Sequence, residues 1–308
     1  MADVLRYVDL ALPDLAGLDR ERTVFLWAVS PIEIHGPHLP VGTDVFVAEE
    51  LQRRYISELA GRHPAITPVV LPSLHAGSDA LPVKGSLSVP APALESILVA
   101  YAKGLAAQGF RYLLLSDNHG GPRHAMAIEA ASRTAWRRWR FYLINPFNTL
   151  FRRMVECDAE LLRETGLGPT TCGDDPDSHA GTNETSLMMV AAPDKIRAGA
   201  EHVPPSQPAP LKGGAKTVAG LAALVRVLGG KRFSRDLEHL ARTLNWVSDP
   251  NMKPYMGDPG KASRDAGERM LNAHLNLAMS LLDRALAGEP VQTDPLLWTL
   301  RAMRRLPE

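Results

Sequence analysis

The sequence predicts an α/β protein of three layers (αβα), in which helices cover both faces of a mainly parallel sheet. Short apolar runs rich in strand-forming residues alternate with segments of helical periodicity along the first half of the chain. This alternation is typical of parallel sheets, because the connection between two parallel strands is usually a helix. Glycine- and proline-rich loops follow the predicted strands. In such folds ligands bind at the carboxyl ends of the strands.

The predicted elements follow one another in a regular order. Residues 23–29 form a continuous apolar run that Ser30-Pro31 ends, as expected for a strand buried on both faces. In the strand predicted at 65–71, Pro68 favours an edge position or an irregular start. Further strands are predicted at 110–115 and 141–144, and helices at 44–59, 91–108, 123–138 and 184–190.

The second half of the chain is predicted to be mainly helical. Residues 166–178 have no periodicity and are rich in Gly, Pro, Asp and Thr, so we expect a surface loop that can cover a site. A Pro/Ser-rich linker at 204–210 precedes three helical stretches, the last at 265–287, and a basic tail. No repeat or composition break forces a second domain. Residues 1–308 are therefore interpreted as one domain with a C-terminal helical elaboration.

The composition argues against several classes of partner. Lys+Arg and Asp+Glu number 34 each, so no global field draws the chain to nucleic acid or to an anionic membrane, and any basic patch must be local. No apolar run reaches the roughly 18 residues of a membrane span, and acidic residues interrupt the N-terminus, unlike a secretory signal. Cys157 and Cys172 make no disulfide framework. We expect a cytoplasmic protein.

The first chemical motif, EIHGPHLPVGTD at residues 33–44, lies between a predicted strand and a predicted helix. Glu33 and His35 point the same way in an extended backbone, and the glycine and prolines that follow could bring Asp44 back towards them. Such ligands suit Zn²⁺, Mn²⁺ or Fe²⁺, and a shared carboxylate can hold two ions about 3.5 to 4 Å apart. Taken alone, the motif is more often a solvated loop, with Asp44 as a helix N-cap.

Two later motifs supply further candidate ligands. His119 follows a predicted strand, in a turn whose two glycines allow close backbone approach. His119 could instead be a plain loop residue, or its turn could bind a phosphate at the N-terminus of the next helix. In SHAGTNETS, residues 178–186, His179 and Glu184 flank a turn into a helix. There Glu184 could be only a first-turn carboxylate favoured by the helix dipole. Spacing alone leaves these alternatives open.

Together these motifs resemble the signature of the creatininase, or creatinine amidohydrolase, family. Three segments carry the resemblance: residues 31–44, 117–121 and 179–186. The segments depart from the family pattern with Ile34 for Gln, Asn118 for Gly and Thr182 for Glu, among other positions. Weaker matches at 82–89 and 257–267 extend the ordered resemblance from about residue 20 to about residue 285.

The resemblance implies a creatininase-like fold, homo-oligomers that are often hexamers, and two divalent metal ions, most simply Zn²⁺, with Mn²⁺ or Fe²⁺ as alternatives. Carried over by position, Glu33 and His119 hold one metal, His35 the other, and Asp44 bridges them. Creatininase proper takes the remaining carboxylate from the position that is Gly121 here. Glu184 is its substitute, as in the family's His-Gly-Gly branch.

The chemistry implied is hydrolysis of a non-peptide or cyclic amide C–N bond in a small molecule. A water that bridges two cations becomes a nucleophilic hydroxide near neutral pH. His179 would then give a proton to the leaving nitrogen, or alternatively orient Glu184. Creatininase proper relies on tryptophans in the loop over its substrate, and this chain has none between Trp139 and Trp246. Creatinine itself is therefore not the expected substrate.

Other functions stay open at this stage. The chain also resembles formylamino-pyrimidine deformylases and a creatininase-like peptidase that trims a modified peptide. A basic phosphate pocket that includes Arg123 would favour the deformylase, and an open groove would favour the peptidase. A ring-opening hydrolase that acts on cyclic ketones is a further alternative, because the same metal-bound hydroxide can attack a ketone carbonyl. From another class, a non-catalytic metal-binding oligomeric protein would keep the fold without turnover. Four further histidines are predicted to be solvated or on helix surfaces: His63, His202, His239 and His274.

Overall fold

The computed structural model describes residues 4–168, 177 and 179–306. Its five-stranded sheet has the order β1-β3-β2-β4-β5, and every neighbouring pair is parallel. The strands are β1 (Leu5–Arg6), β2 (Thr23–Ala28), β3 (Thr67–Val70), β4 (Tyr112–Ser116) and β5 (Tyr142–Ile144). Phe25 of β2 pairs with Val69 on one side and Leu113 on the other. β2 is therefore central, which explains why all six of its residues are buried.

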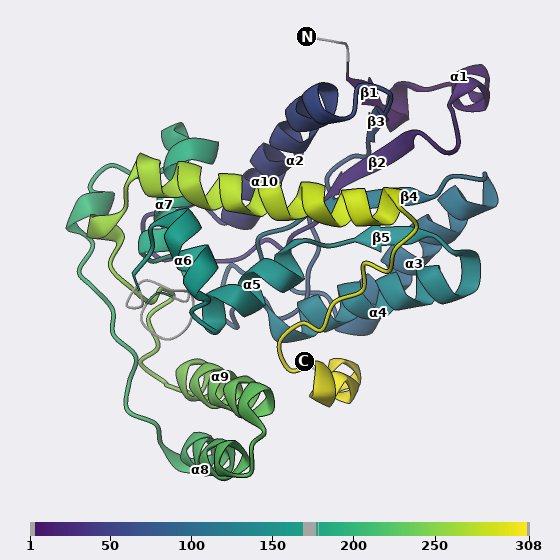
Figure 1. Ribbon diagram of the computed structural model, residues 1–308. Helices are drawn as coiled ribbons and strands as arrows, with labels where there is room; N and C mark the ends of the chain where they lie inside the picture. Colours follow the sequence, from purple (N-terminus) through teal and green to yellow (C-terminus); the bar gives the residue numbers. More distant parts are fainter. Residues whose placement is uncertain (1–3, 169–176, 178, 307–308) are drawn as a thin grey trace.

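Helices cover both faces of this sheet (Figure 1), which confirms the predicted three-layer class. Val24 and Leu26 of β2 contribute to the core on one face, Phe25 and Trp27 to the core on the other. The first core is completed by α2 (Thr43–Arg62), α7 (Thr182–Ala191) and α10 (Arg264–Leu286). The second is completed by α3 (Ala91–Ala107) and α4 (Pro122–Trp139). Because both faces are covered, the strand is continuously apolar.

β3 is not the edge strand that Pro68 favoured in the sequence prediction, because β1 lies outside it. The outermost strand there is the two-residue β1, which pairs only with Val69 and Val70. Pro68 lies beyond that pairing, so its missing N–H leaves no hydrogen bond to β1 unmade. A strand of two residues has no detectable periodicity, which is why β1 was not predicted.

The second half of the chain is helical, as predicted. Its elements are α5 (Phe147–Val155), α6 (Ala159–Thr165), α8 (Gly213–Val227), α9 (Lys231–Val247) and a C-terminal 3-10 segment η5 (Trp298–Arg305). α8 packs chiefly on α9, and Figure 1 shows this hairpin standing below the main body. The loop predicted at 166–178 lies largely outside the described residues, as does Cys172. The assignment of the whole chain to one domain stays a prediction.

Shorter elements complete the described chain. They are α1 (Leu12–Gly17) and the 3-10 turns η1 (Tyr7–Asp9), η2 (Pro193–Lys195), η3 (Ala200–His202) and η4 (Pro259–Lys261). Within the described ranges, no helix combines the length and the apolar character that crossing a bilayer requires.

Two of the histidines predicted to be solvated are buried instead, so that prediction was wrong. His239 on α9 is 5% exposed and His274 on α10 is 2% exposed. The His274 ring lies 6.0 Å from the Phe147 ring and 6.2 Å from the Tyr55 ring, centroid to centroid. Burial among these rings lowers the pKa of His274 to about 4.

We expect His274 to make the fold less stable as the pH falls from about 6.5 towards 4. In this window the unfolded chain protonates the ring and the folded protein does not, so protons favour unfolding. Between pH 7 and pH 5, we expect His274 to lower the free energy of unfolding by about 2 kcal/mol. Urea unfolding of wild type and His274→Phe at both pH values measures it. An identical pH dependence in the two proteins would contradict the assignment.

Candidate metal centre and active site

The predicted site residues meet at the carboxyl ends of β2 and β4. Glu33 and His35 lie in the loop after β2, and Asp44 is in the first turn of α2. His119 follows β4, which pairs directly with β2, so the two loops are neighbours. Glu184 is in the first turn of α7, which packs against α2. The sheet order thus joins segments that are far apart in sequence.

Asp44 stands between two groups of potential metal ligands. Its Oδ1 lies 3.4 Å from Nε2 of His35, and its Oδ2 lies 3.3 Å from Nδ1 of His119. Glu33 Oε2 is 3.1 Å from the same atom of His119, and Glu184 Oε2 is 3.5 Å from the same atom of His35. Donor atoms on one tetrahedral Zn²⁺ lie about 3.3 Å apart. Each group could therefore hold one ion, with the Asp44 carboxylate shared between them.

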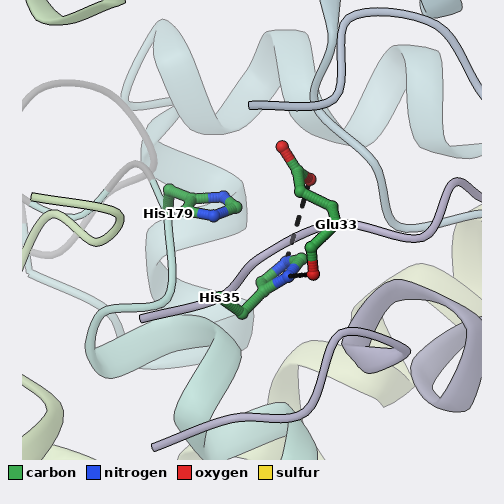
Figure 2. A group of neighbouring side chains, drawn as sticks. All are labelled: Glu33, His35 and His179. Carbon is green, nitrogen blue, oxygen red and sulfur yellow. Dashed lines mark hydrogen bonds and ion pairs between the residues drawn. The ribbon is translucent and has the colours of Figure 1, made fainter. Parts of the chain in front are cut away.

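His179 joins a third group of potential ligands with Glu33 and His35 (Figure 2). Its ring centroid lies 4.3 Å from that of His35, and its Nδ1 lies 3.9 Å from Oε2 of Glu184. The geometry therefore admits direct metal binding by His179, a role that the motif comparison did not suggest. It brings His179 into the same cluster as the five predicted ligands.

Each imidazole of the cluster is oriented by a backbone carbonyl. Nδ1 of His35 lies 3.0 Å from the carbonyl oxygen of Glu33, and Nε2 of His119 lies 3.0 Å from that of Ser78. Nε2 of His179 lies 2.8 Å from the carbonyl oxygen of Ile34. When these nitrogens donate, the opposite nitrogen of each ring is left for the cluster. Metal-binding histidines are held in this way.

The charges and pKa shifts of the cluster favour the binding of divalent cations. Burial would lower the pKa of His35, but Asp44 and Glu184 raise it to about 10. Burial opposes the same shift at His119, whose pKa Glu33 and Asp44 raise well above its usual value. Nε2 of His35 and Oδ2 of Asp44 are buried without a hydrogen-bond partner among the described residues. Cations bound between these atoms would satisfy both and would neutralise the carboxylates in place of ring protons.

The carboxylates respond to the same charges. Burial would raise the pKa of Glu33 and Asp44, but the neighbouring imidazoles lower both, that of Asp44 well below its usual range. Burial raises the pKa of Glu184, against the opposing effect of His35. Glu184 is therefore the carboxylate of the cluster that is most easily protonated when no metal is bound.

A second layer of polar contacts holds the His119 turn. The buried Asp117 accepts hydrogen bonds from Ser30 Oγ at 3.0 Å and from the His119 N–H at 3.1 Å, and its Oδ2 lies 3.2 Å from Nε2 of His124. His124 lies behind the site and is fully buried, whereas His75 is exposed.

Gly121 is where a side chain would disturb the cluster most. A Cβ there would lie 2.8 Å from the carbonyl oxygen of Ser78 and would overlap the ring of His119. We expect Gly121→Ala to weaken metal binding about 10- to 100-fold, because it displaces the carbonyl that orients His119. Metal titration followed by thermal shift measures this.

The matched control is Gly104→Ala in α3, where a Cβ would meet nothing within 4 Å. That change should leave metal binding unaltered and stabilise the helix by up to about 1 kcal/mol. Equal metal affinity in the Gly121→Ala and wild-type proteins would show that the turn tolerates a side chain, against the packing described here.

The cluster opens into a cavity of about 430 Å³, a size suited to a small substrate. Glu33, His119, His179 and Glu184 line it, whereas His35 and Asp44 lie deeper. The opposite wall comes from the 208–211 segment and from α9, through His239, Arg242, Thr243 and Trp246. These α9 residues recur at helical spacing, which is the signal that sequence analysis did not use.

One tryptophan, Trp246, lines the cavity beside the candidate site. The Trp246 ring lies 5.6 Å from the His179 ring, centroid to centroid, and its N–H donates to the carbonyl oxygen of Lys253. Trp246 is the residue at which the tryptophan-free interval after Trp139 ends. Trp246 enters the cavity from α9, which follows the 204–210 linker.

Arg123 lies outside the cavity, and His38 lies behind the ligand loop. Arg123 pairs with Asp79 through its side chain and through its backbone N–H. It is not among the residues that line the cavity. His38 is buried behind the loop, where its Nε2 lies 2.9 Å from Thr185 Oγ1 and burial lowers its pKa to about 4. A neutral His38 in this position supports the ligand loop from behind.

Comparison with known proteins agrees with this geometry. The family described as "Creatininase: Creatinine amidohydrolase" matches residues 8–282. The chain belongs to the creatininase family. Solved structures share the fold: a protein from Bacteroides fragilis described as a creatinine amidohydrolase has a TM-score of 0.63 at 19% identity, covering 95% of this chain and 100% of that one. A creatininase variant described as Zn-Zn type has a TM-score of 0.62 at 17% identity, covering 92% and 99%.

Curated relatives of this creatininase-family chain carry the name mycofactocin precursor peptide peptidase. The protein from Mycobacterium ulcerans is 25% identical over 237 residues, which are 71% of this chain and 84% of that protein. The protein from Mycolicibacterium smegmatis is 27% identical over 171 residues, 54% of this chain. That match spans only 58% of the relative's length.

Proposed function

We propose that the protein is a binuclear metal-dependent hydrolase that cleaves an amide-type C–N bond. The observation that carries this proposal is the Asp44 carboxylate, whose two oxygens face His35 and His119 in separate ligand groups. Membership of the creatininase family supports a metal-dependent amidohydrolase in general. The candidate ligands come from the loops after β2 and β4 and from the first turns of α2 and α7, and they meet beside one cavity, which argues against a protein that only binds metal for structure.

Five residues are proposed as metal ligands. Glu33 and His119 would hold one ion, His35 and Glu184 the other, and Asp44 would bridge them. Solved proteins of the same fold are described with Mn or as Zn-Zn type, which supports divalent ions here. Mixed imidazole and carboxylate donors favour Zn²⁺, with Mn²⁺ or Fe²⁺ as alternatives. When bound, two such ions lower the pKa of a water and polarise a carbonyl oxygen.

His179 is proposed to move the proton. When its Nε2 donates to the carbonyl oxygen of Ile34, Nδ1 faces Glu184 and the cavity. In the neutral ring, Nδ1 accepts a proton from the attacking water. The same atom then returns the proton to the leaving nitrogen, which must leave as an amine. The Trp246 ring beside His179 limits the water that reaches this proton path.

The substrate is proposed to be a small amide, cyclic or otherwise non-peptide. The cavity volume of about 430 Å³ fits such a molecule. A peptidase is the second candidate, favoured by the curated relatives of that name. A formamide deformylase with a phosphate pocket built on Arg123 is less favoured, because Arg123 pairs with Asp79. Homo-oligomerisation and a cytoplasmic location remain predictions.

An assay of metal-depleted and reconstituted protein tests this function. We expect hydrolysis of at least one compound in a panel of cyclic amides, formamides and short peptides, lost after chelation and regained with Zn²⁺ or Mn²⁺. Which compound reacts distinguishes the small-amide hydrolase from the peptidase. Metal binding without turnover of any compound would instead favour the non-catalytic alternative.

A further inference from the structure

A second cavity, of about 900 Å³, lies away from the candidate active site, and six of its fifteen lining residues are arginines. It is formed by the start of α3, the C-terminal half of α4 and the segment η5, which Figure 1 shows beside α4. Its charged lining residues are one glutamate, Glu95, and six arginines: Arg133, Arg137, Arg138, Arg301, Arg304 and Arg305. A chain with no net charge thus gathers a strong positive charge in one hollow.

Only part of this charge is neutralised by neighbouring carboxylates. Arg133 pairs with Glu129 and Asp294, and Arg304 pairs with Glu95. For the other four arginines, no carboxylate oxygen of the described residues lies within the 4.0 Å of an ion pair: Arg137, Arg138, Arg301 and Arg305. Such a cluster repels itself, and a bound anion would relieve the repulsion.

Helix ends do not account for the cluster. Arg137 and Arg138 lie in the last turn of α4, and Arg304 and Arg305 at the end of η5, where cations are favoured. This preference for cations explains the arginines at each helix end taken separately. It does not explain why two ends more than 150 residues apart in sequence face the same cavity.

Some of the guanidinium groups are held in position. The guanidinium carbons of Arg133 and Arg301 lie 4.6 and 5.4 Å from the centroid of the Trp298 ring. Arg304 is fixed by Glu95, with Nε 2.8 Å from a carboxylate oxygen. Arginine forks held in this way lose little entropy when they bind paired oxygen atoms, as in phosphate groups.

We propose that this arginine cavity binds a ligand that carries two or more phosphate groups. Four guanidinium groups that have no carboxylate partner in the described part of the chain call for more than one negative charge, and phosphate oxygens match the arginine fork. The cavity lies at the opposite end of α4 from the His119 turn. Its first α4 residue, Ala130, is eight residues beyond the helix start at Pro122, about 12 Å along the axis. The proposal is independent of the proposed hydrolysis.

Isothermal titration with inorganic tripolyphosphate at constant ionic strength tests it. The test variant is Arg138→Ala/Arg305→Ala, since both side chains are exposed and form no hydrogen bond with the described residues. The matched control is Arg197→Ala/Lys216→Ala, which removes two exposed positive charges elsewhere. We expect the Kd to rise about tenfold or more in the test variant and to stay within about twofold in the control.

Tripolyphosphate also chelates metal ions, so Asp44→Ala is titrated in parallel. Binding that is intact in Asp44→Ala and weakened in Arg138→Ala/Arg305→Ala supports the arginine cavity. Binding lost in Asp44→Ala but kept in the double variant would assign it to the metal centre and overturn the proposal. No binding by wild type, or equal weakening in test and control variants, would overturn it too.

Discussion

Replacing Asp44 with asparagine is expected to lower turnover about 10³-fold or more and to abolish metal-dependent stabilisation. The two oxygens of Asp44 face different imidazoles, one that of His35 and the other that of His119, so its loss disables two ligand groups together. An asparagine of the same shape has one oxygen and no charge to offset two cations. It also leaves His35 and His119 without the carboxylate between them.

Turnover of an active compound and thermal shift with added Zn²⁺ or Mn²⁺ measure both effects. The control is Asp194→Asn, an exposed carboxylate in η2 that pairs with Lys195 at the surface. It should behave as wild type. Retention of both turnover and metal response in Asp44→Asn would show that the carboxylate is structural, as a helix-start residue of α2 would be.

Replacing His179 with glutamine is expected to lower kcat about 10²- to 10⁴-fold while KM and metal content change little. Glutamine can still donate to the carbonyl oxygen of Ile34, which the ring nitrogen reaches at 2.8 Å. It cannot carry a proton towards the leaving nitrogen.

Metal content separates this role from the other two open to His179. Loss of one metal equivalent in His179→Gln would make it a ligand, as its grouping with Glu33 and His35 permits. A raised KM with normal kcat would make it a residue that only orients Glu184 or the substrate. Either result would contradict proton transfer by His179.

Much of the fold could be predicted from the sequence because its central strands and long helices have strong patterns. β2 is apolar throughout, since helices cover both of its faces, and α2 carries a stripe of buried residues that includes Leu51 and Tyr55. β1 could not be found, because two residues show no period and their pairing with β3 depends on tertiary contacts. α5 and α6 are short and were also missed.

The candidate site, like the fold, was predictable from the sequence only in part. Glu33, His35 and Asp44 lie within one continuous motif, so their proximity follows from a single loop. Glu184 was assigned only through the family resemblance, and it reaches the cluster because α7 packs on α2. The cavity-lining residues of α9, including Trp246, have helical spacing in the sequence, but this spacing does not reveal that α9 lies beside the metal ligands.

Metal content of protein purified without chelator tests the central claim most directly. Mass spectrometry of wild type and Glu184→Ala should give about two and about one equivalents of Zn, Mn or Fe, because Glu184 serves only one of the two groups that share Asp44. Wild-type protein that holds no metal, even after reconstitution, would contradict a binuclear centre and leave the buried carboxylates and imidazoles of this cluster without their proposed role.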